Sequence, residues 1–264
     1  MYWTDPTSLP TPQFLKMENN DLIKRAEDLC RRCEKSCSVT MTGFLSPAER
    51  FLLEKQFKNR PDCSLLFSGG HSECERTVAF FLPEYMEPEY FDPSEYICAM
   101  KLTAHFGTPG HRDYMGAILG MGVGREWVGD IWVDENTAYV FCLPSVQRHL
   151  LSIDKAGRVG IKAESIELEK IPAPKRQIKE VSFSVMSMRL DAVTAGMFNL
   201  SRTEAAKQIN QGNVSFNYQE MLKTDCPVSV GDIISLRGSG KGKISGTGGN
   251  SRKGRLFVYA EIYK

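Results

Sequence analysis

The sequence lacks the features of membrane, secreted and disulfide-stapled proteins. No apolar run in the 264 residues approaches the roughly 18 to 20 residues that a membrane-spanning helix requires. The first residues, MYWTDPTSLPTPQF, contain no basic region followed by an apolar stretch, as a secretion signal would. The 8 cysteines show no disulfide-framework spacing. These absences predict a cytosolic protein that has no membrane partner.

Three of the cysteines are close enough in sequence to raise the question of a metal site. Cys30, Cys33 and Cys37 are three and four residues apart, which places them on one face of a helix. A metal site would need a fourth ligand, and none lies nearby in the sequence. Free cysteine packs as a small hydrophobic residue, so a buried helix face is the better interpretation. We therefore expect no metal and no other cofactor.

The sequence also lacks complete catalytic fingerprints. The segment GSGKGKISGTGGNSRKGR at 238–255 fails the spacing of a phosphate-binding loop, because Ile244 follows Lys243. The His-Arg-Asp triplet at 111–113 is not accompanied by the Asp-Phe-Gly, glycine-rich loop or strand lysine of a kinase. The glycines at 116–124 lie in and after a predicted helix, whereas a methyltransferase fingerprint follows a strand. We expect a non-catalytic protein that has no small-molecule substrate.

The net charge of +1 hides an uneven distribution of charged residues. Residues 175–264 contain 14 Lys and Arg against 7 Asp and Glu, a net charge of +7. The rest of the chain contains 19 basic and 25 acidic residues, a net charge of −6. This division favours a polyanionic partner for the C-terminal part, although a solvated basic face would give the same count.

The pattern of elements predicts an α+β protein of three small domains. After a loose leader at 1–20, an α/β N-terminal domain spans 21–93. It has a helix from Asp21 to about Cys37, a second helix that Ser46 and Glu49 begin as a capping box, and two strands. The strands are predicted at 63–67 and 76–82, and prolines at 83, 88 and 93 mark the first boundary.

A middle domain at 94–170 has the predicted order β-α-β-β-α-β, which is typical of ferredoxin-like and RRM-like domains. Its strands are expected at 96–105, 127–133, 137–143 and 158–168, and its helices after Gly110 and at 144–153. Tyr139 and Phe141 share one strand face. They could stack bases or be covered by another domain, but we favour a place in the core.

A proline-rich, charged linker is predicted at 171–181, followed by the last domain at 182–264. Leu190, Val193 and Met197 share a helical face, and Ser201 with Glu204 forms a capping box on a second helix. Strands follow from Val214, at 233–236 and at 256–263. Residues 238–255 are expected to form a basic finger that is flexible without RNA and can be deleted without unfolding the protein.

This last segment, from about Met186 to Lys264, resembles the S4 (αL-type) RNA-binding family. The resemblance is carried by Arg189-Leu190-Asp191, Ser201-Arg202-x-x-Ala205, Ile209-x-x-Gly212-x-Val214, and Asp232 before Ile233. Where many S4 domains have Asn-Gly in the hairpin turn, this chain has Asn217-Tyr218. The resemblance and the polar helix faces together indicate an RNA-binding set: Arg189, Asp191, Ser201, Arg202, Thr203, Lys207, Gln208, Gln211, Asn213, Lys223, Arg237, Lys241, Lys243, Arg252, Lys253 and Arg255.

The front of the chain resembles the YlmH family of bacterial S4-domain proteins. The motifs include Gly43-Phe44-Leu45-Ser46-Pro47-x-Glu49, Phe67-x-Gly69-Gly70, Gly110-His111-Arg112-Asp113-Tyr114-x-Gly116-Ala117, and Arg125-Glu126-x-x-Gly129-Asp130-Ile131. The resemblance implies binding of rRNA and tRNA on the large ribosomal subunit, in ribosome-associated quality control of stalled peptidyl-tRNA. His111, Arg112 and Arg125 are candidate RNA or ribosome contacts, and a monomer is expected. The alternatives are an RNA-modifying enzyme targeted by its S4 domain and an adaptor linked to cell division.

Overall fold

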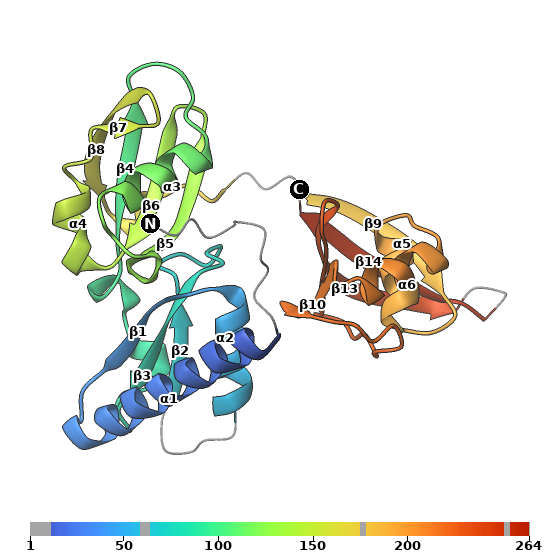
Figure 1. The fold of residues 1–264 in the computed structure, drawn as a ribbon. Coiled ribbons are helices and arrows are strands. Elements are labelled where there is room, and N and C mark those ends of the chain that lie inside the picture. The colour runs from blue at the N-terminus through green and yellow to red at the C-terminus, as the bar shows by residue number, and fades with distance from the viewer. Residues whose placement is uncertain (1–11, 59–63, 175–177, 251–253, 264) are drawn as a thin grey trace. The chain divides into compact units, whose positions relative to one another are not determined.

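The computed structural model describes residues 12–58, 64–174, 178–250 and 254–263 (Figure 1). The chain divides into two compact units, Met1–Pro174 and Lys175–Lys264, called here the N-terminal unit and the C-terminal unit. Both combine helices with antiparallel sheets, which confirms the α+β class. In the part of the chain that the structure describes, no helix is long and apolar enough to cross a membrane.

The described residues of the N-terminal unit form two sheets and four α-helices. Its helices are α1 (Pro12–Ser36), α2 (Pro47–Phe57), α3 (His111–Gly120) and α4 (Pro144–Leu150). Its strands are β1 (Thr40–Leu45), β2 (Ser64–Ser68), β3 (Thr77–Leu82), β4 (Cys98–Ala104), β5 (Val128–Asp134), β6 (Thr137–Cys142), β7 (Lys155–Ala156) and β8 (Val159–Ile166). Short 3-10 helices cover Pro88–Tyr90, Pro93–Glu95, Arg125–Trp127 and Leu168–Lys170.

The first sheet has the strand order β1-β3-β2, and the helices α1 and α2 pack on one of its faces. Ser46 and Glu49 form the predicted capping box at the start of α2, with the Ser46 N–H donating to Glu49 Oε2 at 2.6 Å. Every residue of β3 is buried, since both faces of this central strand are covered. The short polar-apolar mixture of β1 was not predicted as a strand.

The leader predicted at 1–20 is wrong for its last residues, because α1 begins at Pro12 and passes through Asp21 without a cap there. A proline is tolerated at the first position of a helix, where its missing N–H costs no hydrogen bond. Residues 1–11 lie outside the described part. Cys30 and Cys33 are buried as expected, but Cys37 is exposed, because the helix ends at Ser36 and Cys37 has a φ of 47°.

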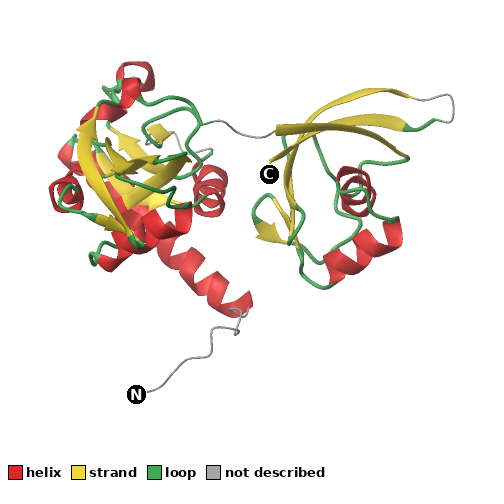
Figure 2. Cartoon of the chain, turned by 90° about the horizontal axis from the view of Figure 1, so that it is seen from above, coloured by secondary structure: helices red, strands yellow, loops and turns green. Residues whose placement is uncertain are grey.

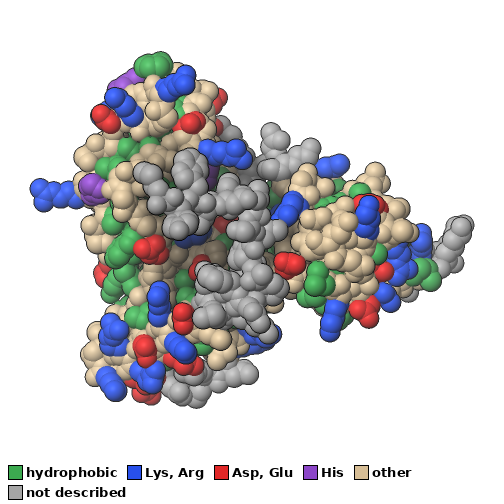
Figure 3. Space-filling model, in the orientation of Figure 1, with side chains coloured by type: hydrophobic (Ala, Val, Ile, Leu, Met, Phe, Trp, Pro, Cys, Tyr) green, Lys and Arg blue, Asp and Glu red, His purple; other side chains and the backbone are tan. Residues whose placement is uncertain are grey.

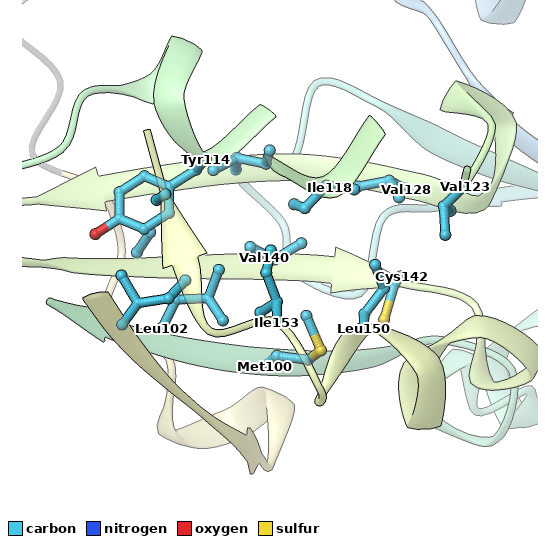
Figure 4. Close-up of a cluster of buried hydrophobic side chains, with 14 of the residues drawn as sticks. Met100, Leu102, Tyr114, Ile118, Val123, Val128, Val140, Cys142, Leu150 and Ile153 are labelled. Atoms are coloured by element: carbon cyan, nitrogen blue, oxygen red, sulfur yellow. The ribbon is translucent and has the colours of Figure 1, made fainter. Parts of the chain in front are cut away.

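The second sheet has the order β5-β6-β4-β8-β7, with every neighbouring pair antiparallel. The predicted β-α-β-β-α-β order is present, with the two-residue strand β7 in addition. Tyr114 and Ile118 of α3 and Leu150 of α4 pack on one face, against Val140 and other residues of the sheet (Figure 4). This core is apolar throughout, although no partner is recorded for the buried Tyr114 hydroxyl among the described residues.

The opposite face of this second sheet packs against the first sheet. Phe141 is 0% exposed, and it belongs to the same buried cluster as Phe44 of β1 and Phe80 of β3. Tyr139 is partly buried against the same cluster. The core location is therefore confirmed for Phe141, whereas Tyr139 is only partly buried. The cover comes from the first sheet, which was predicted to belong to a separate domain. The boundary placed at residue 93 does not separate two bodies, because the two sheets share this core within one compact unit.

Where the structure describes it, the C-terminal unit has one six-stranded sheet of order β11-β10-β12-β13-β14-β9 and two helices. The elements are β9 (Ile178–Val185), α5 (Leu190–Met197), α6 (Arg202–Asn210), β10 (Val214–Phe216), β11 (Gln219–Glu220), β12 (Ile233–Leu236), β13 (Gly240–Asn250) and β14 (Leu256–Tyr263). Figure 2 shows α5 and α6 on one face of this sheet.

The structure corrects two predictions near this unit. The linker predicted at 171–181 is wrong at both ends: Ile171 is only 4% exposed in the N-terminal core, and residues from Ile178 already belong to β9. The flexible finger predicted at 238–255 is wrong for 240–250, which form β13 between β12 and β14. Glycine-rich sequence still makes a strand here because neighbours on both sides satisfy its backbone. Deleting this segment would therefore remove an interior strand; 251–253 lie outside the described residues.

The shared core of the two N-terminal sheets predicts a strong effect of Phe141→Ala. Its ring centroid lies 4.8 Å from that of Trp132, and truncation leaves a cavity between the sheets. We expect the free energy of unfolding to fall by about 3–5 kcal/mol, measured by urea denaturation. Phe106→Ala is the control, since Phe106 is 65% exposed and its loss should change stability by less than about 0.5 kcal/mol. Equal stabilities of the two variants would contradict the shared core.

Candidate nucleic-acid interface

The helices α5 and α6 carry the residues predicted to contact RNA, and their apolar faces fix how those residues are presented. Leu190, Val193 and Met197 of α5 are buried against the sheet, together with Ile209 of α6, as the sequence predicted. Gly196 of α5 allows the helix to approach β9, because a Cβ there would lie 2.2 Å from the ring of Phe183. The polar faces of both helices are therefore directed away from the sheet.

Asp191 lies at the start of α5, and its side chain is only 7% exposed. Its Oδ2 accepts hydrogen bonds from Arg202 Nε at 3.0 Å and Arg202 Nη2 at 2.9 Å. Its Oδ1 accepts from Arg189 Nε at 3.3 Å and from the Ala192 N–H at 2.8 Å. A buried carboxylate needs such partners, because removal from water is costly for an unpaired charge. Asp191, predicted as an RNA contact, is instead placed to hold two arginines.

The two arginines remain accessible from the solvent. The side chains of Arg189 and Arg202 are 42% and 58% exposed, although both are bound to Asp191. One carboxylate neutralises one of the two guanidinium charges, so the cluster keeps a net positive charge. Each guanidinium has five N–H donors, and Asp191 uses one from Arg189 and two from Arg202. The remaining donors are available for phosphate oxygens in a fixed orientation.

The beginnings of the two helices differ in how their free N–H groups are used. On α5, the N–H groups of Leu190 and Asp191 donate to the carbonyls of Cys226 and Thr224, each at 2.9 Å. On α6, Ser201 Oγ accepts from the Glu204 N–H at 3.1 Å. The predicted capping box is only half formed among the described residues, because the Glu204 carboxylate accepts from Gln208 instead. The start of α6 is therefore the more open of the two.

An exposed stripe runs along α6 beyond the arginine pair. Thr203, Lys207 and Gln211 are four residues apart and therefore lie on one side of the helix. All three are exposed, and the Lys207 ammonium is 4.0 Å from Glu204, at the limit of an ion pair. Gln208 and Asn213, which were also predicted to contact RNA, have structural hydrogen bonds instead. Gln208 donates to Glu204 at 2.7 Å and accepts from Asn213 at 2.8 Å.

The other predicted residues are spread over the unit. Arg237, at the end of β12, is exposed beside Asn213, whose carbonyl accepts the Arg237 N–H at 3.0 Å. Lys223 is exposed in the loop that closes the start of α5. Lys241 and Lys243 lie on β13, and Arg255 is exposed just before β14. Arg252 and Lys253 lie outside the described residues. Figure 3 shows Lys and Arg side chains over the visible surface of this unit.

A polar clamp around the β10–β11 turn was missed from the sequence. Asn217 Nδ2 donates to Asp232 Oδ1 at 2.9 Å, and Asn217 Oδ1 accepts from the Ile233 N–H at 2.9 Å. Asn217 and Tyr218 have φ values of 48° and 65°, as a two-residue type I′ turn requires. The departure from Asn-Gly is thus accommodated by a tyrosine in the left-handed region. The asparagine in this turn was the available clue.

In the N-terminal unit, Arg125 is part of an internal polar seam. Its Nη1 donates to the Gly129 carbonyl at 3.2 Å, and its own carbonyl accepts from Arg76 Nη2 at 3.1 Å. Burial and the nearby Arg76 lower the pKa of Arg125. Burial lowers the pKa of Arg76 as well, and Arg76 also donates to the Phe44 and Val128 carbonyls. This geometry gives Arg125 a structural role, and its proposed RNA contact stays a prediction.

His111 and Arg112 are exposed at the start of α3, where Asp113 Oδ2 accepts the Gly110 N–H at 2.8 Å. No partner is recorded for the His111 or Arg112 side chains among the described residues, so both are accessible. No group of three or more His, Cys, Asp or Glu residues within the described ranges is arranged to hold a metal ion.

Comparisons with known proteins place both parts of the N-terminal unit in one family. Residues 18–85 match the family model "YlmH, N-terminal", and residues 88–170 match "Putative RNA-binding domain in YlmH". The chain is 27% identical over 253 residues to "Ribosome-associated protein quality control protein P2" of Bacillus subtilis (strain 168). That alignment covers 96% of this chain and 98% of the relative.

The structure was also compared with solved structures. "Cell division protein ylmH from Streptococcus pneumoniae" matches with a TM-score of 0.49 and 19% sequence identity. The match covers 65% of this chain and 99% of that chain. The assignment rests instead on the two adjoining family models and on the nearly full-length relative: the chain belongs to the YlmH family.

Proposed function

We propose that this protein is a non-catalytic RNA-binding factor that acts on the ribosome through an S4-type C-terminal unit. The observation that carries the proposal is the pair of arginines held by buried Asp191 beside the exposed stripe Thr203, Lys207 and Gln211. Fixed guanidinium groups suit phosphate oxygens, and the net charge of +7 in residues 175–264 suits a polyanion.

The relatives support a ribosomal setting for this binding. The Bacillus subtilis relative is named as a ribosome-associated quality control protein, and one matching family model is described as an RNA-binding domain. The finer proposal is that the chain binds structured rRNA and tRNA on the large subunit, where a stalled peptidyl-tRNA remains. The resemblance of residues 186–264 to S4 modules supports that part, since such modules hold structured RNA by shape and phosphate contacts.

The middle part of the chain can contribute only through surfaces other than its covered sheet face. In RRM domains, aromatic side chains on the open sheet face stack bases. Here Phe141 is buried and Tyr139 is partly buried against the first sheet. An RNA contact from residues 88–170 would therefore use exposed positions elsewhere, of which His111 and Arg112 are the candidates.

The first test replaces Arg202 and Lys207 with Gln. After Arg202→Gln, the amide can still donate a hydrogen bond to Asp191. The substitution therefore removes the positive charge with little change to the local structure. Affinity for a structured rRNA fragment should fall on the order of tenfold per lost phosphate contact at about 0.1 M salt. The slope of log K against log salt should decrease by about 1 per contact, measured by filter binding.

The control for this test is Lys162→Gln with Lys170→Gln, two exposed lysines of the N-terminal unit. It removes the same charge from the other unit and should leave affinity within about twofold of the wild type, because neither lysine belongs to the proposed interface. Wild-type affinity of the Arg202/Lys207 variant at low salt would rule out the proposed interface.

A second test separates position from charge at Asp191. Asp191→Asn adds a net positive charge, so simple attraction predicts tighter RNA binding. We expect weaker binding instead, because both arginines lose the carboxylate that orients them, with the free energy of unfolding lowered by about 1–3 kcal/mol. Asp225→Asn is the matched control, since Asp225 is exposed in the same unit. Tighter binding by Asp191→Asn would refute the positioning role.

A further inference from the structure

The sheet of the C-terminal unit has a second face, opposite α5 and α6 (Figure 2). Exposed aromatic rings lie on this face. Along β14, Val258, Ala260 and Ile262 are buried under the helices. The alternate residues Phe257 and Tyr259 are 41% and 45% exposed on the outer face. No described helix of this unit covers that face, so the two rings are open within the unit.

The ring of Tyr259 lies along β13 and over its glycines. A Cβ added to Gly246 would be 3.8 Å from Tyr259 Cδ2, and one added to Gly248 would be 3.0 Å from the Tyr259 hydroxyl. The same position at Gly248 would be 3.2 Å from Phe257 Cβ. Because Gly246 and Gly248 have no side chains, one face of the Tyr259 ring packs on the backbone of β13. The other face of the ring is available for stacking.

Basic residues border the aromatic pair on the same face. Lys243 pairs with Glu261 in the register of β13 and β14, and Lys241 pairs with Tyr263, so all four share the face with Tyr259. The Lys241 ammonium is 5.8 Å from the Tyr263 ring centroid and 6.0 Å from that of Tyr218. Glu261 also lies there and accepts from the Tyr263 hydroxyl at 3.1 Å. Glu180 of β9 pairs with Glu261 in the register and is exposed on the same face. The face thus combines open rings, two lysines and two carboxylates.

This combination fits single-stranded nucleic acid better than a duplex or an apolar protein surface. Single-strand sites pair a basic track for the backbone with aromatic rings on which successive bases stack. In a strand, residues two apart project from one face about 6.6–6.8 Å apart, so Phe257 and Tyr259 offer two neighbouring stacking positions. Paired bases present only their edges in the grooves, and their ring faces are not accessible to such a platform.

We propose that this outer face, formed by Phe257, Tyr259, Lys241 and Lys243, binds a single-stranded RNA segment by base stacking. This inference extends the proposed function, and it rests on that function for the assumption that the polyanion is RNA. The α5–α6 face holds structured RNA through phosphates, while the opposite face of the same sheet takes unpaired bases. Because the two sites lie on opposite faces, each can be removed separately.

The test measures binding of the full chain to a fluorescent oligouridylate of about 12 nucleotides, by anisotropy at low salt. Phe257→Leu with Tyr259→Leu keeps apolar area but removes both rings, and affinity should fall about tenfold or more per ring. Gly248→Val leaves both rings in the sequence but fills the space under Tyr259, and it should also weaken binding. Circular dichroism and urea unfolding verify that each variant is folded.

The matched control is Leu222→Ala with Val230→Ala, which alters exposed apolar residues of the same unit that do not belong to the face. Its affinity for the oligouridylate should equal that of the wild type. The Arg202/Lys207 variant should keep oligouridylate binding and lose the structured fragment, whereas the Phe257/Tyr259 variant should show the reverse pattern. That crossed pattern distinguishes failure of this inference from failure of the proposed function.

Three outcomes would overturn the inference. One is oligouridylate binding by the Phe257/Tyr259 variant that is as tight as that of the wild type, with the variant folded. Another is a folded variant that loses association with ribosomal subunits while oligouridylate binding is unchanged, which would assign the face to a protein partner. Absence of wild-type oligouridylate binding at low salt would equally refute it, whatever the result with structured RNA.

Discussion

The carboxylate of Asp191 is the group through which the two helices of the C-terminal unit are held in one geometry. It lies at the start of α5 and binds Arg202 at the start of α6, so it fixes the junction between them. Its burial makes the arrangement rigid, because a desolvated charge that loses its partners is strongly destabilising. The same hydrogen bonds aim Arg189 and Arg202 outward, which ties the stability of the helix pair to the shape of its basic surface.

Local rules predicted much of this unit, and their failures have identifiable causes. The apolar positions of both helices, the Ser201 cap and the left-handed Gly212 at φ 72° follow from periodicity and backbone sterics. The burial of Asp191 could not be predicted in this way, because its partners come from a separate helix. Strand β13 was missed because glycines have low strand preference, and only its neighbours β12 and β14 make the pairing favourable.

The N-terminal unit shows the same limit of local reasoning on a larger scale. The β-α-β-β-α-β order could be predicted from alternation, but not which partner covers the aromatic face of its sheet. That partner is the first sheet, whose central strand β3 presents Phe80 toward Phe141. Asp130 joins the two parts further by accepting the N–H groups of Glu75 and Arg76 at 2.8 and 3.0 Å. The partly buried position of a charged residue such as Arg76 is therefore explained by its hydrogen bonds between the two sheets.

The two large sheets of the chain thus use their aromatic residues in opposite ways. In the middle part, Phe141 lies under another sheet, and its ring faces are used in packing. In the C-terminal unit, Tyr259 rests on glycines, and one side of its ring stays open. A module whose helix face is polar and whose sheet face is aromatic can distinguish paired from unpaired RNA by which face engages, since phosphates are available in both forms but ring faces only in one.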